Sequence, residues 1–202
     1  CRLMLQAFLE AGRLEAGCDE AGRGCIAGPV CAAAVILPEQ FDLPLLNDSK
    51  KLTQAAREHL RPEIERQALA YAVAFVSPKR IDTINILQAS FEAMHKALKG
   101  LAIKPDFLLI DGNRFRPFDG IPHECIIKGD GRMASIAAAS ILAKTYRDDY
   151  MLNLHSRYPH YQWHKNKGYP TTAHREAVRL HGLCPHHRRS FACLPTQLTF
   201  GL

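Results

Sequence analysis

Residues 18–37, CDEAGRGCIAGPVCAAAVIL, place two adjacent acids and a glycine-flanked arginine directly before a continuous apolar run. The run, residues 27–37, consists mostly of small and β-branched side chains, which is typical of a strand buried on both faces. Segments 70–78 and 107–111 have the same character, and 123–128 is a shorter candidate strand. We therefore expect a sheet at the centre of the fold, with the two acids at the end of its first strand.

Helical patterns separate these strands. A helix capped by Ser49 or Thr53 is expected to run to about residue 69, because both side chains can accept a hydrogen bond from a first helical turn. Residues 85–99 gather apolar side chains on one face, and 132–154 continue as a long helix. Two strands, two helices, then strands and helices again indicate an α/β fold with a mixed sheet flanked by helices.

The last quarter of the chain has a different pattern. Beyond about residue 155 only helix and loop signals remain, with proline and glycine at intervals. We assign residues 1–154 to a core. Residues 155–202 then form a small helical and loop part of the same structural unit, which we expect to contribute to ligand binding.

Composition indicates a globular protein. The 202 residues are 47% hydrophobic and 23% charged, and no apolar run approaches the roughly 20 residues that a membrane helix requires. The first residues lack the pattern of a secretory signal, and the seven cysteines include no CxxC pair. We expect a monomeric cytoplasmic protein with reduced thiols and no membrane partner.

Positive charge is concentrated in residues 144–189. This segment contains nine Lys and Arg residues against three acids, an excess equal to the net charge of +6 of the whole chain. It also contains seven of the ten histidines and the single tryptophan. Cations mixed with aromatic side chains suit a nucleic acid, although a solvated helical face is the alternative explanation.

Four acids stand out by their positions. Asp19 and Glu20 lie at the end of the first strand, Asp111 closes the apolar segment FLLID, and Asp130 lies between two glycines. Because groups at the carboxyl ends of strands meet in one crevice, the four are candidates for one cluster. Their mutual repulsion requires a cation, and hard oxygen ligands suit Mg²⁺ or Mn²⁺. Two such ions beside a basic surface suggest phosphodiester cleavage.

Each acid also has a purely structural interpretation. Asp111 before glycine is a common turn residue, Asp130 is a possible N-cap, and Glu20 has Arg23 as a possible partner. A geometric objection applies as well, because consecutive strand residues point to opposite faces of a sheet. Asp19 and Glu20 then enter one site only if nearby glycines bend the strand.

The motifs of the chain, taken in order, resemble those of bacterial type 2 ribonuclease H, ribonuclease HII. The resemblance runs from about residue 14 to 191 and rests on CDEAGRG (18–24), NDSKKL (47–52), LIDGN (109–113), IKGDGR (127–132), SIAAASILAK (135–144), KGYPT (167–171) and HHRRSF (186–191). It implies a ribonuclease H-like mixed sheet with a helical C-terminal part. The implied activity is cleavage of RNA in RNA–DNA hybrids and at ribonucleotides embedded in duplex DNA, leaving 3′-hydroxyl and 5′-phosphate ends.

The same resemblance implies roles for individual residues. The four acids match the family's catalytic and metal-binding acids, with Mn²⁺ or Mg²⁺ as the cofactor. Gly22, Arg23 and Gly24 match the segment that senses the ribose 2′-hydroxyl, the group that distinguishes RNA from DNA. Tyr169 matches the tyrosine that stacks on the adjoining sugar. Further contacts to phosphate, or structural roles, are expected at Lys50, Ser135, Ser140, Lys144, Arg188 and Arg189.

Other interpretations remain open. A nucleic-acid-binding module without catalysis would use the basic segment alone, but it leaves the acids unexplained. A zinc site is a further alternative, with suitable ligands in Cys184, His186, His187 and Cys193. The spacing between Cys184 and His186 is, however, tighter than in common zinc motifs.

The end of the chain loosely resembles the short peptides by which repair proteins bind a sliding clamp. In PTQLTFGL, residues 195–202, the contacts would come from Gln197, Leu198 and Phe200. The alternative is that the two apolar side chains pack back on the domain.

Overall fold

The computed structural model describes residues 5–194 and is built around one mixed sheet. Its strands are β1 (Glu15–Ala21), β2 (Val30–Ile36), β3 (Ala70–Val76), β4 (Phe107–Asp111) and β5 (His123–Ile126), in the spatial order β3-β2-β1-β4-β5. β1, β2 and β3 pair antiparallel, whereas β1, β4 and β5 pair parallel. The C-terminal ends of β1 and β4 therefore lie at the same edge of the sheet.

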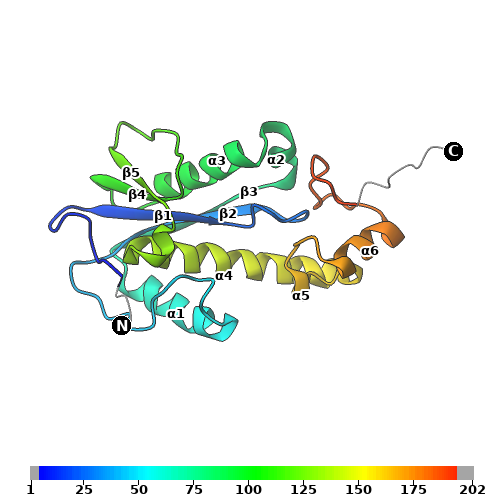
Figure 1. Cartoon of the computed structure of the whole chain (residues 1–202), viewed down its shortest axis with the longest axis horizontal. Coiled ribbons are helices and arrows are strands. Elements are labelled where there is room, and N and C mark those ends of the chain that lie inside the picture. The colour runs from blue at the N-terminus through cyan, green and yellow to red at the C-terminus, as the bar shows by residue number, and fades with distance from the viewer. Residues whose placement is uncertain (1–4, 195–202) are drawn as a thin grey trace.

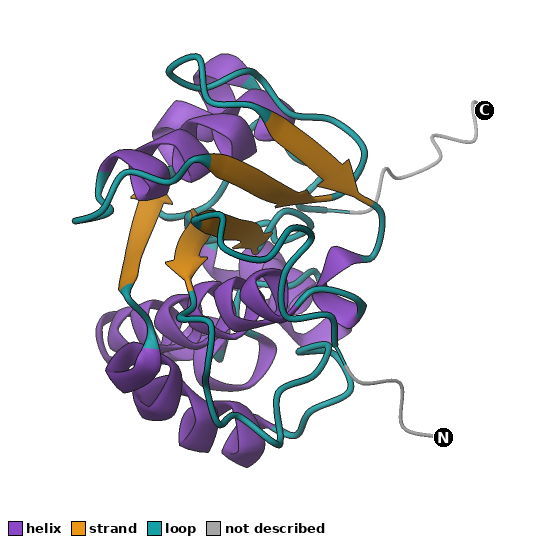
Figure 2. Ribbon diagram, turned by 90° about the vertical axis from the view of Figure 1, so that its left-hand side faces the viewer, coloured by secondary structure: helices purple, strands orange, loops and turns teal. Residues whose placement is uncertain are grey.

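Helices cover both faces of the sheet (Figures 1 and 2). One face is covered by α4 (Ala134–Arg157), with α1 (Gln54–Gln67) packed beside it, and the other by α2 (Pro78–Ile84) and α3 (Ile86–Lys99). The chain also forms two 3-10 turns, η1 (Gly129–Gly131) and η2 (Pro159–Tyr161), and two C-terminal helices, α5 (Trp163–Asn166) and α6 (Thr172–His181). This confirms the α/β fold with a mixed sheet flanked by helices.

Small side chains let the central strands be covered on both faces. Every residue of β2 is buried: Ala32 and Ala34 belong to the core under α3, while Ala33 and Val35 belong to the core under α4. Gly17 of β1 lies so close to α4 that an added Cβ would meet the carbonyl carbon of Ser135 at 2.2 Å. The long helix can therefore lie directly against β1, which positions the acids that follow.

Most element boundaries lie within a few residues of the sequence prediction. The strand expected over 70–78 ends at Val76, because Ser77 caps α2 and accepts a hydrogen bond from the Arg80 N–H. The cap of α1 is Thr53, which accepts from the Ala56 N–H at 3.2 Å. Ser49, the other candidate cap, lies outside the helix.

The C-terminal helices share a core with the end of α4. Buried Trp163 and Tyr161 pack in one hydrophobic cluster with Met151 of α4 and with Ile26 and Ala27 of the segment after β1. Along residues 5–194, no helix combines the length and the apolar character needed to cross a bilayer.

Candidate active site

Asp19 and Glu20 reach one hollow from opposite faces of β1. Alternation along the strand is regular, with Cys18 in the core under α3 and Gly17 against α4. Both carboxylates line a hollow of about 330 Å³ at the end of the sheet. Because they belong to the last residues of the strand, they meet around its end without the bend that the sequence seemed to require.

We call this concavity the active-site hollow. Its other lining residues come from the turn after β1, the loop before α1, the end of β4, α4 and the loop after α5, and they include Arg23, Lys50, Asp111, Ser140, Lys144 and Tyr169. Most of the residues that the sequence singled out are thus brought together from segments far apart in the chain.

Asp111 and Asp130 are fixed by short contacts next to this hollow. Asp111 is the last residue of β4, and its Oδ1 accepts a hydrogen bond from the Gly129 N–H at 2.7 Å. Asp130 lies in η1, with only 2% of its surface exposed, and its Oδ2 accepts from the Lys50 ammonium at 2.7 Å. The parallel pairing of β4 with β1 is what brings these acids beside Asp19 and Glu20.

Burial and mutual repulsion act on the acids together. Burial raises the pKa of Asp19 well above its usual range, and the charges of Glu20 and Asp111 raise it further. Burial also raises the pKa of Glu20, although Arg23, 3.1 Å away, opposes the shift. The pKa of Asp111 is raised by burial and then by Asp130. Arg23 and Lys50 compensate the negative charge of this cluster only in part.

The donor set fits a hard divalent cation, because buried, mutually repelling carboxylate oxygens are the ligands that such ions prefer. Among residues 5–194, however, no three His, Cys, Asp or Glu side chains converge into a ready-made ion cage. One reason is that the Lys50 ammonium occupies an oxygen of Asp130. A bound divalent cation would supply neutralising charge beside that of Lys50.

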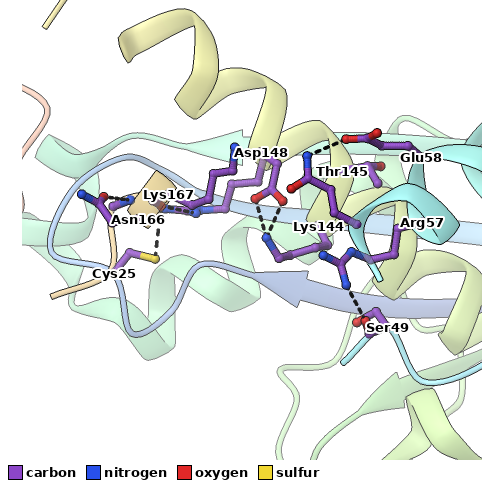
Figure 3. Close-up of polar contacts among 12 residues, drawn as sticks. Cys25, Ser49, Arg57, Glu58, Lys144, Thr145, Asp148, Asn166 and Lys167 are labelled. Atoms are coloured by element: carbon purple, nitrogen blue, oxygen red, sulfur yellow. Dashed lines mark hydrogen bonds and ion pairs between the residues drawn. The ribbon is translucent and has the colours of Figure 1, made fainter. Parts of the chain in front are cut away.

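Two cations border the hollow on the α1 and α4 side (Figure 3). Lys144 faces Asp148 one helical turn along α4, and burial lowers the pKa of Lys144 against the effect of that acid. Arg57 of α1 donates to the carbonyl oxygens of Ser49 at 2.8 Å and Leu52 at 2.6 Å. Arg57 thereby holds the loop that carries Lys50. The sequence did not indicate this role, because Arg57 lies in a helical segment without a recognisable motif.

Arg188 is an interior residue that binds main-chain carbonyl oxygens. Its side chain is completely buried and donates to the carbonyl oxygens of Gly22 at 2.7 Å, Arg23 at 2.8 Å and Gly28 at 3.0 Å. Each nitrogen of the guanidinium donates one hydrogen bond to a main-chain carbonyl oxygen. Of the two roles expected for Arg188, phosphate contact or structural contact, these bonds correspond to the structural one, because they fix the turn that follows β1.

Arg147 makes a matching set of contacts that the sequence analysis did not assign. From α4 it donates to the carbonyl oxygens of Pro29 at 3.0 Å, Ala27 at 3.1 Å and Lys167 at 2.8 Å. It therefore links the segment after β1 to the loop that carries Tyr169. The available signal was its position on one helical face with the apolar Ala143, Met151 and Leu154.

The turn after β1 is built on a glycine that cannot be replaced freely. Gly22 has φ +90°, and a Cβ there would lie 1.9 Å from Nε of Arg147. An added Cβ at Gly24 would meet nothing within 4 Å. Arg23 stands between them with 52% of its side chain exposed, and Tyr169, 41% exposed, lines the same hollow. The turn thus presents an arginine and an open backbone to the active-site hollow.

The remaining candidates divide into buried and exposed residues. Ser140 is bonded to Ser49 through their Oγ atoms at 2.8 Å and also lowers the pKa of Asp19. Ser135 is only 3% exposed and does not line the hollow, so the structure gives it a packing position. Arg189 is exposed, and its main-chain N–H donates to Asp82 at 3.0 Å.

Much of the charge in residues 144–189 is already engaged. Arg147 and Arg188 are buried, Lys144 and Arg179 form ion pairs, and Arg175 binds main-chain carbonyl oxygens. The surface cations of this segment are therefore Arg157, Lys165, Lys167 and Arg189, fewer than the sequence suggested.

The zinc site considered from the sequence is absent from the described residues. Nδ1 of His187 accepts from the Cys184 N–H at 3.1 Å, and its Nε2 contacts Nε2 of His174 at 3.2 Å. Sγ of Cys193 donates to the Arg188 carbonyl oxygen. In residues 5–194 no group of three zinc-binding side chains is formed.

Known proteins share both the sequence and the fold. The model of the family described as Ribonuclease HII matches residues 16–194. The chain belongs to the ribonuclease HII family. It is 63% identical to a ribonuclease HII of Parabacteroides distasonis, over 98% of this chain and all of the relative, and 58% identical to that of Porphyromonas gingivalis, over 94% of each chain.

Solved structures agree with this assignment. The ribonuclease H2 of Pyrococcus horikoshii matches with a TM-score of 0.74 at 28% identity, covering 89% of this chain and 94% of that one. A structure of the PCNA:RNase HII complex of Archaeoglobus fulgidus matches with a TM-score of 0.72 at 26% identity, covering 88% and 95%. As a ribonuclease HII, the chain is a metal-dependent endoribonuclease that cleaves RNA in RNA–DNA hybrids. The alternative of a binding module without catalysis is thereby excluded.

Proposed function

We propose that this endoribonuclease also cuts at single ribonucleotides embedded in duplex DNA, leaving 3′-hydroxyl and 5′-phosphate ends. The observation that carries the proposal is that Arg23 and Tyr169 line the same hollow as Asp19, Glu20 and Asp111. A recognition element for one ribose and its neighbour therefore lies directly beside the cleavage site.

Asp19, Glu20, Asp111 and Asp130 are the proposed metal ligands, with Mg²⁺ or Mn²⁺ as the ion. When bound, two such ions supply an activated water and stabilise the leaving oxygen. The raised pKa values of Asp19, Glu20 and Asp111 support this assignment, because neighbouring cations favour the ionised carboxylates. Lys50 holds Asp130 in an ion pair, and its exposed ammonium is a candidate contact for the substrate phosphate.

Ribose recognition is assigned to the turn Gly22–Arg23–Gly24 and to Tyr169. The carbonyl oxygens of Gly22 and Arg23 are fixed by Arg188, so the main chain is rigid before substrate binds. A rigid polar backbone can hydrogen-bond a 2′-hydroxyl, and DNA lacks that group. The exposed ring of Tyr169 supplies a flat surface for the adjoining sugar. Lys144, Ser140 and Arg189 remain candidates for contacts to the backbone of the strand.

The decisive experiment compares duplex DNA that contains one ribonucleotide with an all-DNA duplex of the same sequence. Cleavage of only the first supports the proposal, and Asp19→Asn or Asp111→Asn is expected to lower its rate by several orders of magnitude. Asp149→Asn is the matched control, because Asp149 is an exposed acid paired with Arg61 outside the hollow. Near-normal rates in both active-site variants would refute the assignment of the acids.

We also propose that the part from residue 155 onward acts as a substrate-binding element within one structural unit. The hydrophobic cluster that joins Trp163 to Met151 supports the single unit. The exposed Lys165 and Arg189, with the half-buried Lys167, support contact with a phosphate backbone. Six free cysteines among the described residues agree with a reducing, cytoplasmic location and with a monomer without disulfide links.

A sliding clamp is a further proposed partner, through Gln197, Leu198 and Phe200, which lie outside the described residues. The support is that the Archaeoglobus fulgidus relative is known in a complex with PCNA. A peptide of residues 193–202 should bind the clamp of the same organism more tightly than its Gln197→Ala, Phe200→Ala variant. Millimolar binding, or equal binding of the two peptides, would refute this partner.

A further inference from the structure

A groove lies along α3, outside the active-site hollow. It encloses about 470 Å³ between α2, α3 and the loop that joins β4 to β5. Its walls carry aromatic and basic side chains, among them Phe91, His95, Lys99, Arg116 and Phe118. We call it the α3 groove.

His95 fixes the shape of the α3 groove. Its Nε2–H donates to the Arg116 carbonyl oxygen at 2.8 Å, which ties the loop to α3. The His95 ring packs against Phe118 with 5.1 Å between ring centroids, and edge-on against Phe115 at 5.2 Å. Phe91 meets Phe115 edge-on as well. The aromatic wall is therefore in place before any ligand arrives.

The rim of the α3 groove carries excess positive charge. Its acid, Glu92, is shared between Arg80 at 2.9 Å and Lys96 at 2.8 Å. Lys99 and Arg116 are exposed, and neither has an ion-pair partner within residues 5–194. A ligand with flat apolar faces and negative charge fits this surface, as an unpaired nucleic-acid strand does.

The α3 groove adjoins the catalytic acids through a second concavity. Phe91 also lines a hollow of about 280 Å³, the α3 hollow, whose walls include Glu20, Asp111 and Arg114. The buried Oγ of Ser90 lines this hollow and has no hydrogen-bond partner among residues 5–194. Glu20 and Asp111 also line the active-site hollow, and Phe91 lines both the α3 hollow and the α3 groove, so the three concavities form a path of neighbouring concavities from Tyr169 past these acids.

We propose that the α3 groove binds an unpaired stretch of the cleaved strand, on the side of the acids opposite Tyr169. The inference rests on the proposed function, because the strand has to cross the acids to enter this path. Phe91 and Phe118 stack on bases, while Lys99 and Arg116 hold phosphates. A paired duplex keeps its bases stacked inside and cannot use the aromatic wall, so the preferred substrates include hybrids with a single-stranded extension.

The test compares a short blunt RNA–DNA hybrid with two extended forms of it, which carry about ten unpaired nucleotides at the 5′ or at the 3′ end of the cleaved strand. An extension of this length is within the range that single-strand grooves bind. Binding is measured in EDTA, and cleavage with Mg²⁺. We expect the extension at one of the two ends to tighten binding at least about fivefold, the lower range for stacking of one base on an aromatic ring. Phe118→Ala and Lys99→Glu should each lose that gain and still cleave the blunt hybrid at the rate of the unmodified protein.

Arg66→Glu is the matched control for Lys99→Glu, because Arg66 is an exposed cation of α1 outside the groove. It should retain the gain. The inference is overturned if the unmodified protein gains nothing from either extension, gains equally from both, or if the gain survives in Lys99→Glu. Failure of the proposed function is seen separately, as no cleavage of the duplex with one ribonucleotide, whatever the effect of the extensions.

Discussion

Arg188 donates a hydrogen bond of 2.7 Å to the carbonyl oxygen of Gly22, across 166 positions of sequence. Together with the contacts of the same guanidinium to Arg23 and Gly28, it joins the C-terminal part to the turn that borders the acids. Burial lowers the pKa of Arg188 to about 10, which still leaves it protonated at neutral pH. A charged side chain is therefore kept in the interior in order to shape the recognition turn.

Replacing Arg188 with Ala should destabilise the protein. Three buried carbonyl oxygens would lose their donor, which costs about 3 kcal/mol or more in the free energy of unfolding. Urea denaturation measures this loss, and cleavage at an embedded ribonucleotide should fall more than cleavage of a long hybrid. Arg189→Ala is the control: it should leave stability nearly unchanged and reduce the slope of log affinity against log salt by about one. An Arg188→Ala variant as stable as the unmodified protein would contradict the positioning role.

Gly22→Ala should be far more damaging than Gly24→Ala. At Gly22 the positive φ and the clash with Arg147 act together, and we expect a loss of about 2 kcal/mol or more in stability. Gly24→Ala meets open space and should fold normally, while its methyl group projects from the turn that approaches the substrate. Thermal unfolding of the two variants, followed by cleavage assays, separates these effects. Similar melting temperatures for both would show that the turn is not constrained as described.

Tyr169→Ala should impair cleavage at a single embedded ribonucleotide more than cleavage of a long hybrid. A long hybrid offers many registers, so loss of one stacking surface matters less there. Tyr169→Phe keeps the ring and should retain most of the activity on both substrates. The ratio of kcat/KM for the two substrates is the measurement, and equal losses in the Ala variant would contradict a role in junction recognition.

The sheet and the grouping of the acids were predictable because local patterns encode them. Apolar strands that end in Asp19 and Asp111 indicate a shared edge of the sheet, which the parallel pairing of β1 with β4 provides. The side chains of Asp19 and Glu20 leave opposite faces of β1 and reach the same hollow around the end of the strand. Alternation along the sequence does not show where a strand ends in the folded sheet, so the objection based on alternation was wrong.

The direction in which an arginine points was not predictable. Arg188 and Arg189 are adjacent and chemically identical, yet one is buried and the other exposed. Which of them turns inward depends on carbonyl oxygens in the segment after β1, and these become neighbours only in the folded chain. The helix α2 was missed for a related reason, since its seven residues follow a strand directly and are defined by the Ser77 cap.

Acid should loosen the C-terminal part through His187. Burial, and then the nearby His174, lower the pKa of His187 to about 4 from an ordinary 6.5, so the folded state favours the neutral ring. The stability that depends on this ring is complete above pH 6.5 and is lost as the pH falls toward 4. His174 also donates to the Tyr169 carbonyl oxygen at 2.8 Å, which connects this loss to the loop that carries Tyr169. The melting temperature should fall more steeply between pH 6.5 and 4 in the unmodified protein than in His187→Gln; equal slopes would contradict the assignment.

Asp19→Asn and Asp111→Asn should stabilise the protein in the absence of metal. The pKa of each carboxyl is raised in the folded state by burial and by neighbouring acids. A raised pKa means that stability is complete below the unfolded pKa and is lost as the pH rises through the folded pKa, so repulsion among the acids costs more stability at pH 8 than at acid pH. The neutral amides remove this repulsion, and the melting temperature in EDTA at pH 8 should rise by a few degrees for about 1 kcal/mol.

Addition of Mg²⁺ should reverse the order of the melting temperatures of the unmodified protein and the two Asn variants. An ion that binds only the folded state stabilises it by RT ln(1 + [L]/Kd), about 1.4 kcal/mol at ten times Kd. The unmodified protein gains this free energy of stabilisation, whereas each Asn variant lacks one metal ligand and is stabilised little by Mg²⁺. Asp149→Asn, outside the hollow, should respond to Mg²⁺ as the unmodified protein does. Because the readout is thermal stability, it tests the metal site independently of cleavage, and an equal Mg²⁺ response in Asp19→Asn and Asp111→Asn would place the ion elsewhere.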